Sequence, residues 1–227
     1  VVSKFGPVAI FMLLTRTFAS YGVEHLKPAV AYVILTVALL LIFLIIGYPA
    51  FIAIFAHLDP FKFAKKITRV AVFGFSTSSS AATLPLNVKT TVEELGVDEK
   101  IASFVLPLGM TINMNGTAIM QVIATLFIAG CAGYSISFTQ LVVIALLALI
   151  ASAGTPAAPG SGAIILFTIL SGLGYVNDAA MLAYSLILAI NRPIEMLVTA
   201  LNVVGDSATS IYVAKSEGVL NEDVYNA

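Results

Sequence analysis

A tract of 77 consecutive residues, 101–177, contains no Asp, Glu, Lys, Arg or His. As one helix, at about 1.5 Å per residue, it would extend roughly 100 Å or more, several times the hydrocarbon thickness of a bilayer. The whole chain is 59% hydrophobic and only 10% charged, whereas about a quarter of the residues in a soluble domain are charged. The sequence therefore predicts a membrane protein in which this tract crosses or re-enters the bilayer repeatedly.

The charge and the cysteine content exclude a nucleic-acid partner and an internal disulfide. The net charge is −1, and the basic residues are too few and too scattered to indicate a nucleic-acid partner. The single cysteine, Cys131, excludes an internal disulfide and is interpreted as a small apolar helix residue. Membrane lipid is the expected partner of the apolar surface.

Two apolar segments precede the uncharged tract. Residues 5–21 are predicted to form a helix. Residues 28–56, which contain no Asp, Glu, Lys, Arg or His, are long enough to span with some tilt. The stretch HLDPFKFAKKITR follows, with a cluster of basic residues at Lys62, Lys65, Lys66 and Arg69. Because such clusters mark the cytoplasmic side of a span, this stretch is predicted to be a cytoplasmic loop.

Two further segments predict re-entrant hairpins. In VAVFGFSTSSSAATLPLNV the serine run and Pro85 weaken a continuous helix, so a hairpin at about 67–88 is favoured over a straight span. Between about 138 and 173, two apolar arms flank ASAGTPAAPGSG, where Pro156 and Pro159 cannot both lie in an undisturbed helix. Irregular backbone at membrane depth is tolerated only where it is buried in protein or lines a cavity.

Each hairpin precedes a span with a polar interior. A broken span is predicted at 101–130, with TINMNGT at its centre, and a last span at 179–214 carries Arg192, Glu195 and Asp206. The order of a hairpin followed by a span therefore occurs twice, and the two hairpins enter the membrane from opposite sides. Inverted repeats of secondary transporters have this organisation. The predicted fold class is an all-α membrane protein of inverted repeats, each a re-entrant helical hairpin plus a broken transmembrane helix.

Four motifs resemble the glutamate transporter family, also called sodium:dicarboxylate symporters. STSSSAATLP resembles the tip of its first hairpin, GMTINMNGTA the Asn-Met-Asp-Gly-Thr element of its seventh helix, ASAGTPAAPGSGAI its second hairpin tip, and ALNVVGDSATSIYVAKSEG its last helix. They occur in family order and spacing across the chain, which resembles the C-terminal part of such a transporter. The resemblance implies a scaffold-type transmembrane helix and loop at 1–27 and an elevator-type transport domain at 28–227.

The resemblance also implies a function. The chain would belong to a sodium-coupled symporter, not an enzyme, for a small amino acid or a dicarboxylate. Such a protein would be a homotrimer, multi-pass in the cell inner (plasma) membrane. Hairpin two would act as the gate, because its glycines at 154, 160 and 162 permit backbone excursions.

Sodium prefers oxygen ligands, which a broken helix supplies as freed carbonyls. By the resemblance, one ion would be bound by carbonyl oxygens of Gly109, Asn113 and Asn202 and by the carboxylate of Asp206. A second ion would be surrounded by Thr111, Ser152, Ala153 and Thr155. Asn115 replaces the aspartate of the family element, which weakens the case for a third sodium site. The alternative is that the asparagines only cap a kink.

The last span carries a polar stripe. Arg192, Glu195, Thr199, Asn202 and Asp206 recur at steps of three and four, which places them on one helical face. An acidic group within a span is costly and usually functional. The alternative is that Arg192 and Glu195 merely pair with each other. By the resemblance, Glu195 would hold the substrate ammonium group, and the expected substrate residues are Ser79, Ser80, Thr117, Ala158, Gly160, Glu195, Thr199 and Asn202.

Departures from the family pattern bear on the substrate. Acidic-substrate members carry an arginine either where Val198 stands or where Ser78 stands. Its absence favours a neutral amino acid, although Arg192 leaves an acidic substrate open. Glu195 also replaces the family aspartate.

The sequence argues against two other classes of membrane protein. An intramembrane protease would need a partner for Ser161, but His25 and His57 flank the second segment and lie in no later span. An ion channel could also use broken helices, but it would leave the paired hairpins and Glu195 unexplained.

Overall fold

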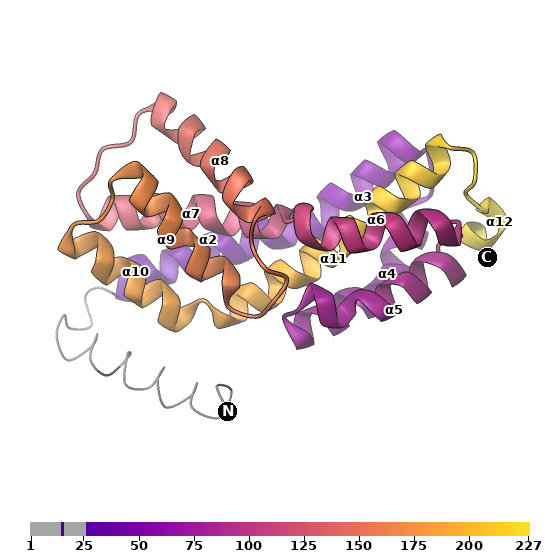
Figure 1. Ribbon diagram of the computed structural model, residues 1–227, viewed down its shortest axis with the longest axis horizontal. Coiled ribbons are helices and arrows are strands. Elements are labelled where there is room, and N and C mark those ends of the chain that lie inside the picture. Colours follow the sequence, from indigo (N-terminus) through magenta and orange to yellow (C-terminus); the bar gives the residue numbers. More distant parts are fainter. Residues whose placement is uncertain (1–14, 16–25) are drawn as a thin grey trace.

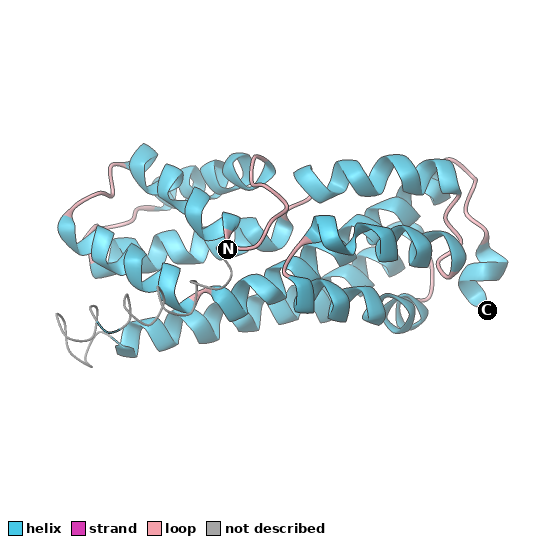
Figure 2. Ribbon diagram, turned by 60° about the horizontal axis from the view of Figure 1, so that its bottom comes forward, coloured by secondary structure: helices cyan, strands magenta, loops and turns pink. Residues whose placement is uncertain are grey.

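The structure, a computed structural model, describes residue 15 and residues 26–227. The predicted helix at 5–21 lies outside the described residues apart from Thr15. The described part is helical and contains no strand (Figures 1 and 2), which confirms the all-α class. Its elements are α2 (Leu26–Ile42), η2 (Phe43–Gly47), α3 (Tyr48–Phe51), η3 (Ile52–Ala56), α4 (Pro60–Thr77), α5 (Ser80–Glu93), α6 (Glu99–Ile112), α7 (Asn115–Cys131), α8 (Phe138–Ala153), α9 (Ser161–Leu173), α10 (Asp178–Ile190), α11 (Arg192–Ser216) and α12 (Glu222–Asn226).

Three helical stretches of the described residues are long and apolar enough to cross a membrane. They are Pro28–Ala56, Glu99–Cys131 and Arg192–Ser216. The first joins α2 to η3 and contains two π-helical turns, η2 and η3. The second contains the interruption between α6 and α7 at Asn113 and Met114. These lengths and compositions, with the hydrophobic surface between the ends, identify a membrane protein.

Helices α4 and α5 form hairpin one. Helix α4 begins where the Asp59 carboxylate accepts a hydrogen bond from Phe61 N at 2.8 Å, with Pro60 in the first turn. The basic cluster that was predicted to be a loop therefore lies within α4, because Asp59 and Pro60 are strong helix-start residues. At the other end Ser78 adopts a left-handed conformation, with φ 49°, and Ser79 caps the start of α5.

Helices α8 and α9 form hairpin two, in the region where the second hairpin was predicted. Helix α8 starts with a capping box between Ser137 and Gln140. Helix α9 starts after Gly160, whose φ of 84° is readily adopted only by glycine. The segment 154–160 between the two helices is irregular.

The region predicted as a single last span, 179–214, consists of two helices, α10 and α11, which meet at Asn191. Pro193 lies in the first turn of α11. Because proline has no N–H, it cannot continue the hydrogen-bond ladder of the preceding helix. The interruption thus follows from one residue that the apolar pattern of the span concealed.

Helix α11 runs through the centre of the molecule and is buried over most of its length. Asn87 Nδ2 of α5 donates to Val203 O at 3.0 Å, and the hydroxyls of Thr91 and Ser207 lie 3.1 Å apart. Both contacts link residues 116 apart in sequence, so α5 runs parallel to α11. The arms of the two hairpins extend toward opposite ends of the molecule and their tips meet near its middle (Figure 1).

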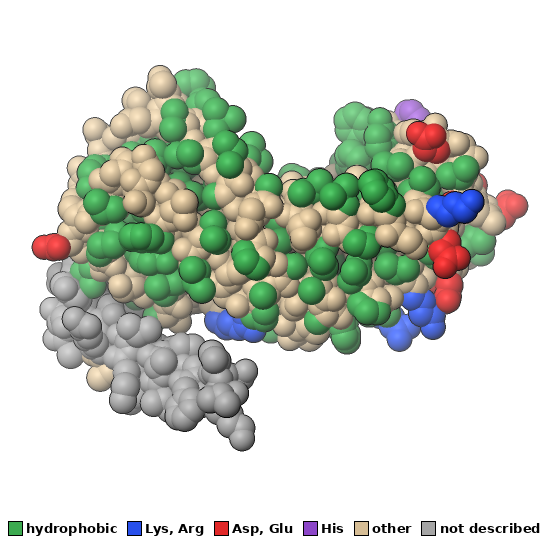
Figure 3. All heavy atoms as spheres, in the orientation of Figure 1, with side chains coloured by type: hydrophobic (Ala, Val, Ile, Leu, Met, Phe, Trp, Pro, Cys, Tyr) green, Lys and Arg blue, Asp and Glu red, His purple; other side chains and the backbone are tan. Residues whose placement is uncertain are grey.

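Most charged side chains visible in Figure 3 gather at the end that carries α12, while hydrophobic side chains cover much of the length between the ends. Lys66 Nζ joins α12 to the base of hairpin one by donating to Glu94 O, Val224 O and Tyr225 O at 2.8 to 2.9 Å. Tyr225 is fully buried, and its hydroxyl donates to Asp59 O. This polar end is suited to water and the apolar middle to lipid.

Candidate functional site

Three interruptions of the helices and one unbroken helix surround a cavity of about 30 Å³. The cavity lies between the two hairpin tips, the break between α6 and α7, and the first half of α11. Its lining residues are Ser78, Ser80, Met114, Thr117, Met120, Thr155, Pro156, Ala157, Ala158, Gly160, Ser161, Gly162, Glu195, Val198, Thr199 and Asn202. Seven of the eight expected substrate residues are among them.

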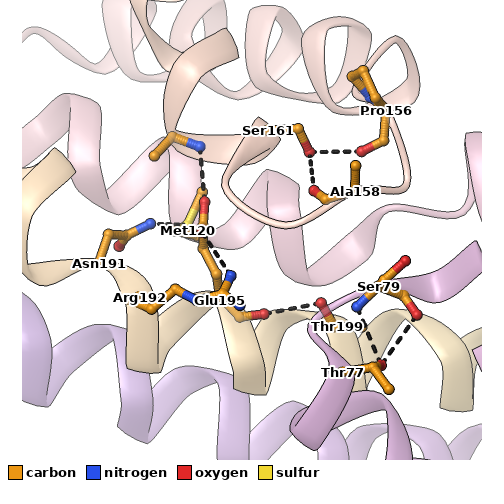
Figure 4. Close-up of polar contacts among 11 residues, drawn as sticks. Thr77, Ser79, Met120, Pro156, Ala158, Ser161, Asn191, Arg192, Glu195 and Thr199 are labelled. Carbon is orange, nitrogen blue, oxygen red and sulfur yellow. Dashed lines mark hydrogen bonds and ion pairs between the residues drawn. The ribbon is translucent and has the colours of Figure 1, made fainter. Parts of the chain in front are cut away.

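The eighth, Ser79, joins the two hairpins directly. Its hydroxyl donates to Ala157 O of hairpin two at 3.0 Å and accepts from Ala82 N at 3.2 Å. In Figure 4 the loop that holds Pro156, Ala158 and Ser161 faces the tip that holds Ser79. The cavity has room for about two water molecules, so an amino acid can enter only when the hairpins separate.

Glu195 lies at the wall of the cavity near α9 and is buried, with 7% of its surface exposed. Its Oε1 accepts from the backbone N–H of Ala163, in the first turn of α9, at 3.1 Å. Arg192 Nη1 is 3.9 Å from Glu195 Oε2. The Arg192 side chain is about half exposed and does not line the cavity. The distance between the two charged groups is therefore long for an ion pair, and only the Glu195 side of the pair is buried. The Glu195 carboxylate still lines the cavity.

Asn202 connects α11 to the break between α6 and α7. Its Oδ1 accepts from Gly116 N at 2.8 Å, and its Nδ2 donates to Thr117 Oγ1 at 3.1 Å and to Met114 Sδ at 3.2 Å. The Thr199 hydroxyl, one turn earlier, donates to Glu195 O. The start of α7 is thus capped by a side chain from another helix.

Asp206 forms a second polar centre, which we call the Asp206 cluster (Tyr48, Gly109, Asn113, Asn115, Gly205 and Asp206). Asn113 Nδ2 donates to Asp206 Oδ1 at 2.9 Å. Asn115 Nδ2 donates to Asn113 Oδ1 at 2.8 Å and to the Tyr48 hydroxyl at 3.2 Å. A Cβ at Gly109 would lie 2.6 Å from Asp206 Oδ1. The structure therefore brings Gly109, Asn113 and Asp206 together, and Asn202 is one turn from Asp206.

The Asp206 carboxylate is 2% exposed. Among the described residues, no Lys, Arg or His nitrogen lies within 4.0 Å of it. A buried carboxylate requires a positive partner or a proton. Carboxylate, amide and backbone oxygens around a broken helix are the donors that a small hard cation prefers. The residues present fit a sodium ion.

The second expected ion set is less closely assembled. Ser152 and Thr155 are buried, but their hydroxyls donate to Leu149 O and Ala151 O within hairpin two. Ala153 ends α8. Thr111 is exposed, and its hydroxyl donates to Leu108 O of its own helix. Helices α6 and α8 do contact each other, but no hydrogen bond joins Thr111 to the other three residues.

Several residues around the site were missed in the sequence. Tyr48 lies inside an apolar helix, and its hydroxyl accepts a hydrogen bond from Asn115. In the sequence, only the adjacent Pro49 distinguished this position from its apolar neighbours. Asn191 accepts from the Tyr32 hydroxyl at 2.7 Å and lies beside Glu195. An asparagine before Arg-Pro in an apolar stretch was the available signal. The methionines at 114 and 120 line the cavity, and in the sequence they were indistinguishable from core residues.

The sequence pattern of the Sodium:dicarboxylate symporter family matches residues 1–216. A Caenorhabditis elegans protein named "Excitatory amino acid transporter" is 34% identical over 209 residues, 91% of this chain and 41% of its own length. The "Proton/sodium-glutamate symport protein" of Bacillus caldotenax is 31% identical over 223 residues, 98% of this chain and 51% of its own length. Human "Excitatory amino acid transporter 1" is 32% identical over 210 residues, 91% of this chain and 38% of its own length. The chain thus spans about half or less of the length of these relatives.

The close packing of the Asp206 cluster can be tested at Gly205. A Cβ there would lie 2.2 Å from the Tyr48 hydroxyl and 2.8 Å from Asn113 Nδ2. We expect Gly205→Ala to destabilise the protein by about 1–3 kcal/mol through overpacking, seen as a lower melting temperature of the purified protein in detergent.

Gly172→Ala is the matched control, because a Cβ there meets no atom within 4 Å, and it should melt at least as high as the wild type. Adding Tyr48→Phe to Gly205→Ala should recover part of the loss, since the closest atom is removed. A Gly205→Ala protein that melts with the wild type would contradict the packing described for this cluster.

Proposed function

Because the chain belongs to the sodium:dicarboxylate symporter family, we propose that it is part of a sodium-coupled symporter that moves a small neutral amino acid by an elevator mechanism. Residues 28–227 would form the mobile transport domain and residues 1–27 part of the scaffold. The protein would be multi-pass in the cell inner (plasma) membrane and assemble as a homotrimer.

The observation that carries the proposal is the pair of buried carboxylates on α11. Glu195 lines the cavity, and Asp206, three turns further along, lies outside it in a cluster of amides and close backbone. Neither carboxylate has a buried basic partner among the described residues. Two cations from solution, a substrate ammonium group and a sodium ion, would satisfy them separately.

A zwitterionic amino acid matches the cavity. Its ammonium group would pair with Glu195. Its carboxylate would lie at the start of α5, where Ser80 lines the cavity and backbone N–H groups at the helix N-terminus favour an anion. Asn202 lines the same cavity and would contribute its amide by exchanging its contact with Met114 Sδ, a weak acceptor, for the substrate carboxylate.

The neutral side chain is proposed because no basic side chain of the described residues lines the cavity. Val198 is there instead, and the Arg192 side chain is half exposed away from the lining. The names of the relatives, which include glutamate and excitatory amino acid transporters, favour the alternative of an acidic substrate. The substrate experiment below separates the two.

Sodium would bind first at the Asp206 cluster, with a second ion beside Thr111 and hairpin two. Asn115 contributes no charge, so a third sodium site is not proposed. The gate would be hairpin two, because its irregular segment 154–160 closes the cavity through Ala157. Opening that contact exposes the cavity, and closing it allows the loaded domain to move.

Replacement of Asp206 tests the ion site. Asp206→Asn keeps the size and removes the charge, so sodium should bind about tenfold more weakly or worse. Amino-acid affinity should recover at least partly at saturating sodium, because ion and substrate stabilise each other reciprocally. The measurement is substrate binding to the intact purified protein across a sodium titration. Asp178→Asn, at the exposed start of α10, is the control, and an unchanged sodium dependence in Asp206→Asn would remove this residue from the ion site.

Two substitutions in α11 test the substrate. Glu195→Gln should weaken amino-acid binding about a hundredfold or more, because it leaves an ammonium group buried and unpaired. Glu195→Asp keeps the charge and should retain binding. Val198→Arg should introduce binding of aspartate or glutamate, because it adds a cation to the cavity wall. Isothermal titration with amino acids and succinate measures all three, and a wild-type preference for aspartate, glutamate or succinate would overturn the neutral assignment.

A crosslink between the hairpin tips tests the gate. Ser79→Cys and Ala157→Cys, in a Cys131→Ala background, place two thiols where a hydroxyl and a carbonyl now touch. A short thiol crosslinker should abolish uptake into liposomes, and uptake should persist in each single-cysteine variant after the same treatment. Wild-type uptake by fully crosslinked protein would show that hairpin two is not the gate.

A further inference from the structure

One hydroxyl in the cavity wall has no hydrogen-bond partner among the described residues. Only two side-chain polar atoms of the described part are buried without a partner, Ser78 Oγ and Gln121 Oε1. Ser78 is 3% exposed and lines the cavity, whereas Gln121 does not. A buried hydroxyl without a partner costs about 1–3 kcal/mol, so its presence in a binding cavity points to a ligand group.

Most other polar side chains of the cavity already have partners. The hydroxyls of Thr155, Ser161 and Thr199 donate to backbone carbonyls, and the Asn202 amide is used on both sides. Glu195 Oε1 accepts from Ala163 N. Ser78 Oγ is therefore the fully enclosed polar atom that is left for the substrate.

The backbone holds Ser78 in this position. Its left-handed conformation ends α4, and its N–H donates to Gly74 O at 2.9 Å. Gly74, one turn before Ser78, packs against Ala200 and Val203 of α11. Ser78 and Val198 both line the cavity, at a wall that includes methionine and alanine side chains.

We infer that the substrate is a small neutral amino acid whose side chain ends in a hydrogen-bonding group, a hydroxyl or a carboxamide, and that Ser78 Oγ binds this group. The inference rests on the proposed function, because it uses the same cavity, with the ammonium group at Glu195 and the carboxylate at the start of α5. A hydroxyl can both donate and accept, so Ser78 suits either group.

The surrounding chemistry excludes the other substrate side chains. No cation of the described lining would neutralise a side-chain carboxylate. An apolar side chain would fit beside Val198 and Met120 but would leave Ser78 Oγ unpaired. Ser78 therefore separates polar from apolar neutral amino acids of equal size.

Isosteric pairs of amino acids test the inference. Threonine and valine differ by a hydroxyl in place of a methyl group, and asparagine and leucine differ similarly by a carboxamide. In sodium, the intact wild-type protein should bind the polar member of at least one pair about three- to tenfold more tightly, the range of one net hydrogen bond. Dissociation constants from isothermal titration provide the ratio.

Ser78→Gly removes the hydroxyl and accepts the left-handed backbone without strain, and Ser78→Ala is a second variant that keeps the Cβ. Both should reduce the polar-to-apolar ratio to within about twofold of one. Ser76→Ala is the matched control, because that hydroxyl donates to Val72 O and does not line the cavity, and it should leave the ratio unchanged.

The outcomes separate the inference from the proposed function. If the wild type binds no amino acid in sodium, both fail. If it binds amino acids but prefers valine and leucine, or if both Ser78 variants weaken all amino acids equally and leave the ratio intact, the inference alone is wrong. In the latter case Ser78 would act on the shared backbone groups of the substrate or on the hairpin tip.

Discussion

An N–H group released at the start of a helix needs an acceptor, and in an apolar medium water cannot supply one. Three of the interrupted helices meet this requirement with side chains. Gly116 N at the start of α7 donates to Asn202, and Ala163 N at the start of α9 donates to Glu195. Ala82 N in α5 donates to Ser79. Because two of these acceptors lie on α11, that helix must pass through the centre, and the polar stripe of the cavity follows from this placement.

The same requirement explains the small residues along α11 and its neighbours. Side chains that cap other helices must approach closely, and glycine permits such approach within a membrane. A Cβ at Gly116 would lie 2.9 Å from Val198 O, and one at Gly109 would meet Asp206. Gly74 of hairpin one packs against α11 in the same way. The close packing of backbones therefore accompanies the hydrogen bonds that cap the interrupted helices. Together they hold the buried carboxylates of Glu195 and Asp206 in place on α11.

The sequence predicted the helical class and the family, because the uncharged tract and four ordered motifs carry strong information. It mispredicted the conformation of residues 62–69, where Asp59 and Pro60 start a helix that the basic cluster had suggested to be a loop. It did not reveal the break at Asn191, because Asn191 and Pro193 lie within a largely apolar stretch. The roles of Tyr48 and Ser78 depend on which helices touch, and a local pattern contains no information on contacts between residues far apart in the sequence, such as Tyr48 and Asn115.

Under the proposed function, coupling between ion and substrate would have a short physical route in this fold. Asn113 contacts Asp206, and three residues later Gly116 contacts Asn202, which lines the cavity. A cation at Asp206 would compete with the Asn113 amide N–H for the carboxylate oxygen Oδ1 and so change the position of the break between α6 and α7. That break carries Met114 and Thr117 into the cavity wall. Ligands on either side would thus act on one short segment. The factor by which one ligand changes the affinity of the other would then be the same in both directions.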